Sequence, residues 1–249
     1  MRAHHRLQRL FVAARLTEGE TITLDGAQAH YLARVLRMKP GGELLLFNGA
    51  DGEWLGAVAG ITRKAVAVSV NAPTRRQTTR SDLLLAFAPV RAARLDWMVQ
   101  RATEMGVGII QPVMTQHTQA PAPSTERMLA NAVEAAEQCG ELSVPEIRDA
   151  RKLDAFLGDL DAGRRLVFCD EGAAREDPVS ILRGIGAGPL AILVGPEGGF
   201  SDAERARLRA LPFVTSLPLG HRILRADTAA VAALTLAQAT HGDWIGARD

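Results

Sequence analysis

Three glycines and a proline, in the stretch Gly195-Pro-Glu-Gly-Gly199, directly follow the apolar run 190–194. Glycine lets a backbone approach a bound molecule closely, and open α/β sheets bind ligands at the carboxyl ends of their strands. Ser201 and Glu204 have the spacing of a capping box, which predicts that a helix begins there. No Gly-Lys-Ser or Gly-Lys-Thr follows, which excludes a P-loop. Glu197 could bond a ribose hydroxyl or an amine; alternatively, the stretch is a tight turn with a solvated glutamate.

A second stretch that could carry chemistry is Leu217-Pro-Leu-Gly-His-Arg-Ile-Leu-Arg-Ala-Asp-Thr228. Arg225 and Asp227 stand where a loop is predicted to enter a helix, and they could form an ion pair over a bound substrate. Alternatively, Asp227 or Thr228 caps that helix. His221 is expected to be a solvated loop residue. The small residues of the helix would allow close packing, for example against a partner subunit.

Other candidate motifs are weaker. Gly184-Ile-Gly-Ala-Gly188 imitates the glycine fingerprint of nucleotide-binding folds, but it precedes a strand instead of following one, so it is interpreted as a flexible loop. Cys139 and Cys169 lie far apart without a Cys-x-x-Cys motif, so neither a disulfide framework nor a zinc cluster is expected. The sequence therefore predicts no metal site.

The elements that position these residues belong to an α/β domain over residues 81–249. Apolar runs typical of buried strands alternate with helical stretches, which favours a largely parallel sheet. The strands are expected at 83–88, 107–113, 166–169, 190–194 and 214–217, and the helices at 94–105, 124–138, 202–211 and 228–240.

Residues 1–72 have a different sequence pattern, which predicts short strands and turns typical of a small β-barrel or sheet. The strands are expected at 21–24, 43–47, 54–59 and 65–70, and one helix at 27–37. Along that helix Tyr31, Val35 and Leu36 would share one face, and Arg34 and Arg37 another. The polar, basic, proline-containing segment 73–80 is the predicted linker.

Charge is unevenly distributed along the 249 residues. The formal net charge is only +1, yet residues 1–80 hold 12 basic and 6 acidic side chains. Local asymmetry of this kind indicates polyanion binding better than the sum does, although a surplus of arginine can also merely solvate a surface. Arg9, His30, Arg34 and Arg37 are the candidate phosphate contacts of this basic part.

Targeting signals are not apparent. The first ten residues carry charge where a signal peptide needs its apolar core, and no apolar run approaches the length of a membrane span. A soluble, cytoplasmic protein without a membrane partner is expected.

The two glycine-containing stretches together resemble those of the SPOUT methyltransferases, and within them the bacterial ribosomal small subunit methyltransferase E family. The similarity extends over most of the chain. Its motifs are Arg34-Val-Leu-Arg-Met-Lys-Pro-Gly-Gly42 with Phe47-Asn-Gly49, Gln100-Arg-Ala-Thr-Glu-Met-Gly-Val107, Glu134-Ala-Ala-Glu-Gln-Cys-Gly140 with Val144-Pro-Glu-Ile147, Gly195-Pro-Glu-Gly-Gly199, and Leu219-Gly-His-Arg-Ile-Leu-Arg225.

The resemblance implies an architecture and an activity. A PUA-like RNA-binding β-barrel domain (1–72) would precede a SPOUT domain (81–249) with a parallel sheet and a C-terminal trefoil knot, in a homodimer. S-adenosyl-L-methionine would bind among the knot loops. Its methyl group would go to N3 of a uridine in 16S rRNA of the small ribosomal subunit, position 1498 in customary RNA numbering.

The resemblance also implies site residues. Arg225 would stabilise charge on the uracil oxygens or steer a phosphate, Asp227 could accept the proton, and Arg222 would join the RNA contacts. The cofactor residues would be Val194, Gly195, Glu197, Gly198, Gly199, Leu217, Leu219, Gly220, Ile223 and Leu224.

This chain departs from the family pattern at two places. Ala226-Asp227 replaces the usual Thr-Glu, which shortens the carboxylate by one methylene and removes a hydroxyl. Gln116-His117 stands where relatives often have Glu-Arg, so an RNA or subunit contact there is not carried over. Two alternatives stay open: a SPOUT methyltransferase acting on another RNA position, and a non-catalytic RNA-binding protein of ribosome assembly.

Overall fold

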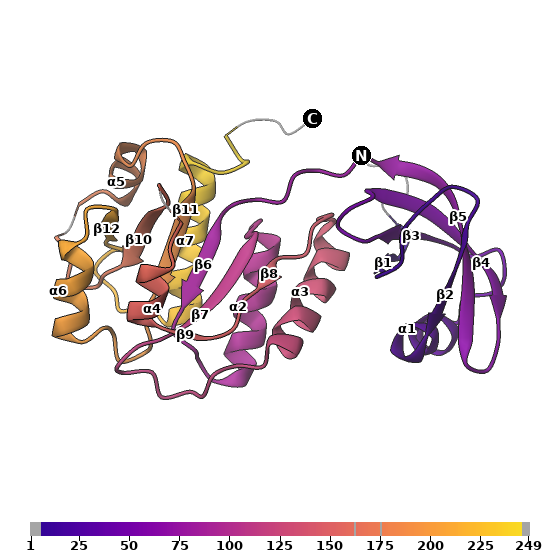
Figure 1. The fold of residues 1–249 in the computed structure, drawn as a ribbon, viewed down its shortest axis with the longest axis horizontal. Helices are drawn as coiled ribbons and strands as arrows, with labels where there is room; N and C mark the ends of the chain where they lie inside the picture. Colours follow the sequence, from indigo (N-terminus) through magenta and orange to yellow (C-terminus); the bar gives the residue numbers. More distant parts are fainter. Residues whose placement is uncertain (1–5, 162, 175, 246–249) are drawn as a thin grey trace. The chain divides into compact units, whose positions relative to one another are not determined.

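The computed structural model describes residues 6–161, 163–174 and 176–245 (Figure 1). The chain divides into two compact units. The first comprises the chain up to Thr79 together with Ala136–Val144, and the second comprises Arg80–Ala135 and the chain from Pro145 onward. The first unit is therefore built from two separate pieces of sequence. The predicted domain, residues 1–72, did not include the second piece.

The first unit contains a five-stranded sheet in the order β1-β3-β4-β5-β2. Side chains alternate between buried and exposed along β2, as expected of a sheet with one face on a core. The core includes Leu32, Leu44 and Val68, all completely buried. The strands are β1 (Arg9–Phe11), β2 (Thr21–Asp25), β3 (Glu43–Phe47), β4 (Glu53–Ile61) and β5 (Ala65–Arg75). Strand β5 thus continues into the segment predicted as a linker.

The predicted helix of this unit is shorter and irregular. It consists of α1 (Gly26–His30) and a π-helical turn, η1 (Tyr31–Val35), in which the amide of Leu36 donates to the carbonyl of Tyr31 at 2.9 Å. The wider turn changes the direction of the side chains, because each residue turns through a smaller angle than in an α-helix. Tyr31 packs on the core, whereas Val35 is 59% and Leu36 37% exposed. The prediction of one shared apolar face was therefore wrong.

The second unit contains a seven-stranded sheet in the order β12-β10-β11-β6-β7-β8, with β9 also paired to β7. Each of its strand pairs is parallel, as predicted. The strands are β6 (Leu84–Phe87), β7 (Ile109–Met114), β8 (Glu146–Ile147), β9 (Arg151–Lys152), β10 (Arg165–Cys169), β11 (Leu190–Val194) and β12 (Val214–Leu217). Every residue of β6 and β11 is buried, which is why their sequences are continuously apolar.

Helices cover both faces of this sheet (Figure 1). Phe156 and Leu208 pack with alternate strand residues such as Phe168 and Leu193 in one apolar core. The helices are α2 (Ala92–Glu104), α3 (Thr125–Cys139), α4 (Leu153–Gly158), α5 (Pro178–Gly184), α6 (Asp202–Ala210) and α7 (Ala226–Thr240). Between α5 and β11 the chain forms a loop, in agreement with the prediction for residues 185–188, whereas Gly184 is the last residue of α5.

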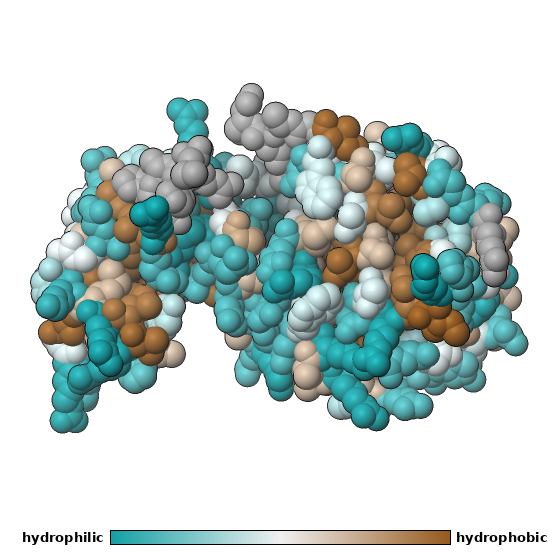
Figure 2. Space-filling model, turned by 180° about the vertical axis from the view of Figure 1, so that it is seen from behind, coloured by the Kyte–Doolittle hydropathy of each residue, from teal (hydrophilic) through white to brown (hydrophobic). Residues whose placement is uncertain are grey.

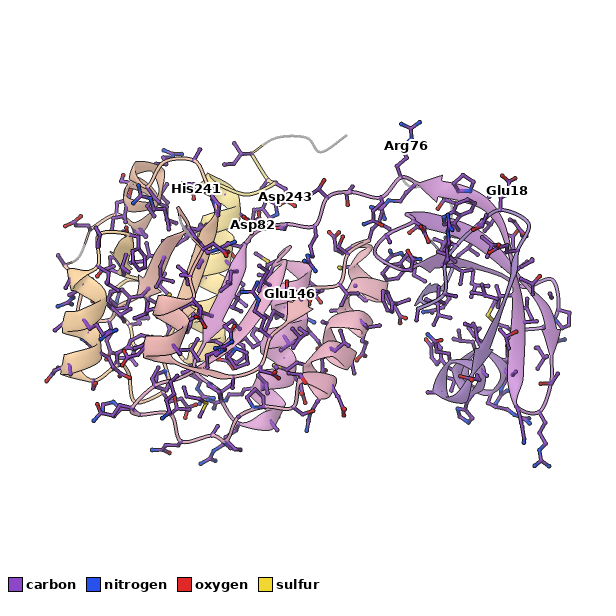
Figure 3. The ribbon with its side chains drawn as sticks, in the orientation of Figure 1. Glu18, Arg76, Asp82, Glu146, His241 and Asp243 are labelled. Atoms are coloured by element: carbon purple, nitrogen blue, oxygen red, sulfur yellow. The ribbon has the colours of Figure 1, made fainter. Side chains whose placement is uncertain are left out.

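One buried arginine joins the amino-terminal ends of β10 and β6, the strands on either side of β11. Arg164, directly before β10, is only 4% exposed and pairs with Asp82, before β6, at 2.5 Å and with Asp161 at 3.0 Å. Figure 3 labels Asp82 at the start of β6. The guanidinium also donates to the backbone carbonyl of Asp82 at 2.7 Å. These bonds fix the amino-terminal end of β10, whose opposite end contributes to the site.

Candidate functional site

A pocket lies where the carboxyl ends of β10, β11 and β12 meet. β10 pairs with both other strands in parallel, so the loops that leave the three strands come together at one edge of the sheet. The lining residues are Cys169, Asp170, Glu171, Val194, Gly195, Pro196, Gly199, Phe200, Arg205, Leu217, Leu219, Gly220, Arg222, Leu224, Ala226 and Ala229. We call this the strand-end pocket.

The loop after β11 has the geometry that its sequence predicts. The Ser201 hydroxyl accepts from the amide of Glu204 at 3.3 Å, and the Glu204 carboxylate accepts from the amide of Ser201 at 2.9 Å. This confirms the capping box that starts α6. A Cβ at Gly195 would lie 2.8 Å from the Phe200 ring, and Gly199 has a φ of +68°. Both positions therefore require glycine.

Most of the predicted cofactor residues line the strand-end pocket. Val194, Gly195, Gly199, Leu217, Leu219, Gly220 and Leu224 do so. Glu197, Gly198 and Ile223 lie outside it. Glu197 pairs with Arg94 of α2, Gly198 is near His117, and Ile223 is 88% exposed.

Sequence reasoning missed the polar wall of the pocket, formed by Cys169, Asp170, Glu171 and Arg205. The Asp170 side chain is fully buried, with Nη2 of Arg209 at 2.6 Å and Nη1 of Arg205 at 3.5 Å. Desolvation raises the pKa of the Cys169 thiol to about 12, so the thiol is neutral near pH 7. Asp170 and Glu171 directly follow strand β10, and the strand-end rule that singled out Gly195 would also have found them, whereas Arg205 comes from α6.

Arg225 and Asp227 do not form the predicted ion pair among the residues that the structure describes. Arg225 is exposed and is the N-cap of α7, which has no side-chain cap. The alternative, that Asp227 or Thr228 caps the helix, was therefore also wrong. Instead, Asp227 accepts from the amide of Thr228 at 2.8 Å, within the first turn. Arg222, predicted to contact RNA, lines the strand-end pocket.

The segment after β7 supports the glycine loop. Nδ1 of His117 lies 3.2 Å from the carbonyl oxygens of both Gly198 and Gly199. The amide of Gln116 donates to the Glu204 carboxylate at 2.8 Å. Gln116-His117, where this chain departs from the family pattern, thus holds the loop in place.

The basic residues predicted for the first unit occupy two kinds of environment. His30 in α1 and Arg34 in η1 are exposed, and so is Arg37, two residues after η1. The Arg9 side chain is only 10% exposed and pairs with the buried Glu53 at 2.9 Å. Its guanidinium lies over the Phe47 ring and donates to three carbonyls, those of Ala136, Glu137 and Glu141. Arg9 therefore anchors residues 136–141. Because its guanidinium is directed inward, we do not propose Arg9 as a phosphate contact.

Comparison with known proteins identifies the family. A family model described as an RNA methyltransferase domain matches residues 77–238, and one described as an RNA methyltransferase PUA domain matches residues 24–71. The ribosomal RNA small subunit methyltransferase E of Rickettsia conorii is 33% identical over 230 residues, which cover 91% of this chain and 93% of the relative. The chain belongs to the ribosomal RNA small subunit methyltransferase E family.

Solved structures share the fold of this methyltransferase E family member. A methyltransferase of Legionella pneumophila, in complex with the bound cofactor S-adenosylmethionine, matches with a TM-score of 0.83 and 29% identity over 95% of this chain and 98% of that chain. The ribosomal RNA small subunit methyltransferase E of Neisseria gonorrhoeae matches with a TM-score of 0.80 and 24% identity, over 96% of this chain and 99% of that chain. The predicted family and the α/β SPOUT fold with a PUA-like domain are confirmed; the trefoil knot stays a prediction.

Two further observations concern metals and membranes. Within the described ranges, His, Cys, Asp and Glu side chains form no group of three or more that could hold a metal ion. Across the same residues, none of the helices has both the length and the apolar character that crossing a bilayer requires.

Proposed function

We propose that this protein transfers the methyl group of S-adenosylmethionine to N3 of a uridine in 16S rRNA of the small ribosomal subunit. The strand-end pocket is the observation that carries the proposal, because it combines a glycine-lined backbone with apolar walls at the ligand-binding edge of a parallel sheet. In support, the relatives are called ribosomal RNA small subunit methyltransferases, and the Legionella protein holds S-adenosylmethionine. We infer a cytoplasmic location from this ribosomal substrate.

The residues of the pocket fit S-adenosylmethionine. Leu217, Leu219 and Leu224 provide apolar walls for the adenine, and the close approach at Gly195 leaves backbone groups for the ribose. Glu171, 58% exposed, offers a carboxylate to hydroxyl or amino groups. When bound, the cofactor supplies a methyl on a sulfonium, so the N3–C bond forms as the S–C bond breaks and the N3 proton passes to a base.

The chain's own contribution to the chemistry is electrostatic and positional. Arg225 is exposed at the start of α7, directly after Leu224 of the pocket, where its charge would stabilise negative charge developing on the uracil oxygens. Asp227 is the candidate acceptor of the N3 proton. Its carboxylate is oriented by the amide of Thr228, which fixes the direction in which the proton would be taken.

The partners follow from both units. Exposed His30, Arg34 and Arg37 would contact RNA phosphates, and such contacts supply affinity more than sequence choice.

For the homodimer, half-exposed Val231, Ala232 and Leu236 of α7 would be covered by a second copy. Figure 2 shows apolar atoms at the surface of the second unit on the side seen from behind. Analytical ultracentrifugation that finds only monomers at micromolar concentration would contradict the dimer.

A methyl-transfer assay tests the proposal. Small subunits lacking the modification are incubated with the protein and isotope-labelled S-adenosylmethionine, and mass spectrometry of the nucleosides should detect labelled 3-methyluridine. Arg225→Ala should lower turnover at least about tenfold while calorimetric affinity for S-adenosylmethionine stays unchanged. Label in another nucleoside would favour a different RNA position. Absence of cofactor binding and transfer would favour the non-catalytic alternative.

A further inference from the structure

A second pocket adjoins the strand-end pocket on the other side of the glycine loop. Its walls are the glycine loop at Pro196–Gly198, the start of α2 at Pro89–Leu95, and the segment 119–124 that leads into α3. Pro196 lines both pockets. We call the second one the loop-side pocket. Both lie within the second unit.

The walls of the loop-side pocket suit a planar, uncharged ring. Pro89, Val90 and Leu95 form one apolar side, and Pro121 and Pro123 belong to the facing segment. Val90 and Leu95 are buried, so the floor is firmly packed, while Pro121 is exposed at the rim. Apolar walls with a few polar groups are typical of sites that hold nucleobases and other small rings.

The charges around the loop-side pocket leave one cation without a partner. Arg94 is paired with Glu197, and Arg127 is paired with Asp96. Arg91, exposed at the start of α2, has neither an ion pair nor a side-chain hydrogen bond to any other residue that the structure describes. An unpaired arginine beside an apolar slot can contact a phosphate while the slot receives the attached base.

Proximity decides what such a base would be. Displacement at a methyl group requires the reacting atoms to lie about 3–3.5 Å apart in line, so the acceptor must bind directly against the donor. Pro196 lines both pockets, so a nucleotide held in the loop-side pocket would meet the donor at the edge that the two pockets share. N3 lies on the Watson-Crick edge of uracil, so the nucleotide must leave its stack and enter a pocket to react.

We propose that the loop-side pocket receives the flipped-out acceptor uridine and that Arg91 holds a phosphate next to it. The proposal rests on the proposed function and assigns its acceptor site. His117 is a positioning residue here, because its ring holds the carbonyls of Gly198 and Gly199 and thereby fixes the glycine loop that borders both pockets.

Photo-crosslinking tests the location without requiring turnover. An RNA fragment with 4-thiouridine at the acceptor position is irradiated with the full-length protein, and the crosslinked peptides are identified by mass spectrometry. Crosslinks within residues 89–95 or 119–124 are expected. Crosslinks confined to other residues, or none at all, would overturn the assignment.

Kinetics of Arg91 variants test the phosphate contact. Arg91→Ala should raise KM for RNA roughly tenfold and lower the crosslink yield, because a charge-assisted hydrogen bond is lost. S-adenosylmethionine affinity should stay within twofold, which shows that the variant is folded, and Arg91→Lys should recover part of the loss. Arg165→Ala, which removes an exposed arginine at the start of β10 on the opposite edge of the sheet, is the matched control. An unchanged KM for Arg91→Ala would overturn the role of Arg91.

The two proposals fail separately. Methylation of uridine by a wild-type protein that crosslinks only elsewhere would remove the loop-side pocket as the acceptor site and leave the function intact. Crosslinks at the expected residues without any methyl transfer would remove the proposed function and still support a nucleotide-binding pocket.

Discussion

At the scale of single residues, Asp170 is a fully buried carboxylate of the strand-end pocket that pairs with two arginines. Its buried carboxylate is held by Arg205 and Arg209 of α6. Removing the charge leaves Arg209 without this ion pair and leaves Arg205 with Glu171, an exposed carboxylate at 3.5 Å, and breaking a buried ion pair costs about 3–5 kcal/mol. Because Arg209 is 44% exposed, we expect Asp170→Asn to lower the free energy of unfolding by about 2–3 kcal/mol in urea denaturation.

The chain offers a matched control for this prediction on the same helix. Asp154 pairs with Arg207 of α6 at 3.0 Å, but both side chains are largely exposed. Exposed pairs of this kind contribute roughly 0–1 kcal/mol, so Asp154→Asn should have little effect. Equal losses for the two variants would show that the buried pair has no special role. Asp170→Asn should also weaken S-adenosylmethionine binding, whereas Asp154→Asn should not.

Single residues also show which part of the site could be predicted from sequence. Gly195 and Gly199 were found because glycine, proline and capping signals are local in the chain. The contact between Asp170 and Arg205 was missed because it forms only when β10 and α6 pack, and no local pattern indicates it. The same holds for His117, whose two carbonyl partners lie more than 80 positions further along the chain.

At the scale of elements, the segment formed by α1 and η1 is the surface that we expect to contact RNA. Arg34 is exposed in η1, and Arg37 is exposed directly after it, two residues beyond Val35. Each lysine or arginine on a phosphate contributes about one unit to the salt dependence of binding. The double variant Arg34→Ala, Arg37→Ala should therefore weaken RNA binding and reduce the slope of log K against log salt by about two.

A second pair of basic residues in the same unit serves as the control. Arg63 and Lys64 are exposed in the turn between β4 and β5, and replacing both with alanine changes the net charge equally. The slope of log K against log salt for this double variant should stay close to that of the wild type in filter-binding titrations. If both double variants flatten the slope to the same extent, the contact is a diffuse effect of charge and not a property of the α1–η1 segment.

Local sequence signals decided how well the fold could be predicted. Apolar residues run through most of β3 and all of β11, turns flank both, and the predicted bounds of β3, β11 and β12 agree with the structure. The short elements β1, β8, β9, α4 and α5 were not predicted. β1 has only three residues, and it pairs with β3, whose sequence lies more than thirty positions away. Such elements form through tertiary contacts instead of local propensity.

At the scale of the whole molecule, the net charge of +1 is the sum of two differently charged parts. The basic surplus of residues 1–80 is divided between exposed side chains such as Arg34 and Arg37 and the internal anchor Arg9. Charge counting alone could not separate these roles, because only the fold shows that Arg9 is directed at Glu53 and at the carbonyls of 136–141. The RNA-binding charge is therefore smaller than the sequence suggests.

The two-piece composition of the first unit leads to a prediction about its independence. Phe47 is completely buried in a cluster with Ala136 and Leu142, and the Arg9 guanidinium has its carbonyl partners in the same segment. A fragment of residues 1–79 would expose this cluster and leave the Arg9 and Glu53 pair partly open to water. We expect the fragment to bind 8-anilinonaphthalene-1-sulfonate and to lack a cooperative thermal transition, because burying an aromatic ring contributes about 1.5–3 kcal/mol in a domain whose total stability is small.

A linked fragment provides the matching control for residues 1–79 alone. Residues 136–144, joined to the end of residues 1–79 by a flexible glycine and serine linker, should restore a cooperative transition, which circular dichroism would detect. Arg9→Ala within the linked fragment should lower the temperature of the transition, whereas Arg15→Ala, at an exposed position, should not. If residues 1–79 alone unfold as cooperatively as the linked fragment, then segment 136–144 only rests on the barrel, and the domain boundary predicted near residue 72 is sufficient for folding.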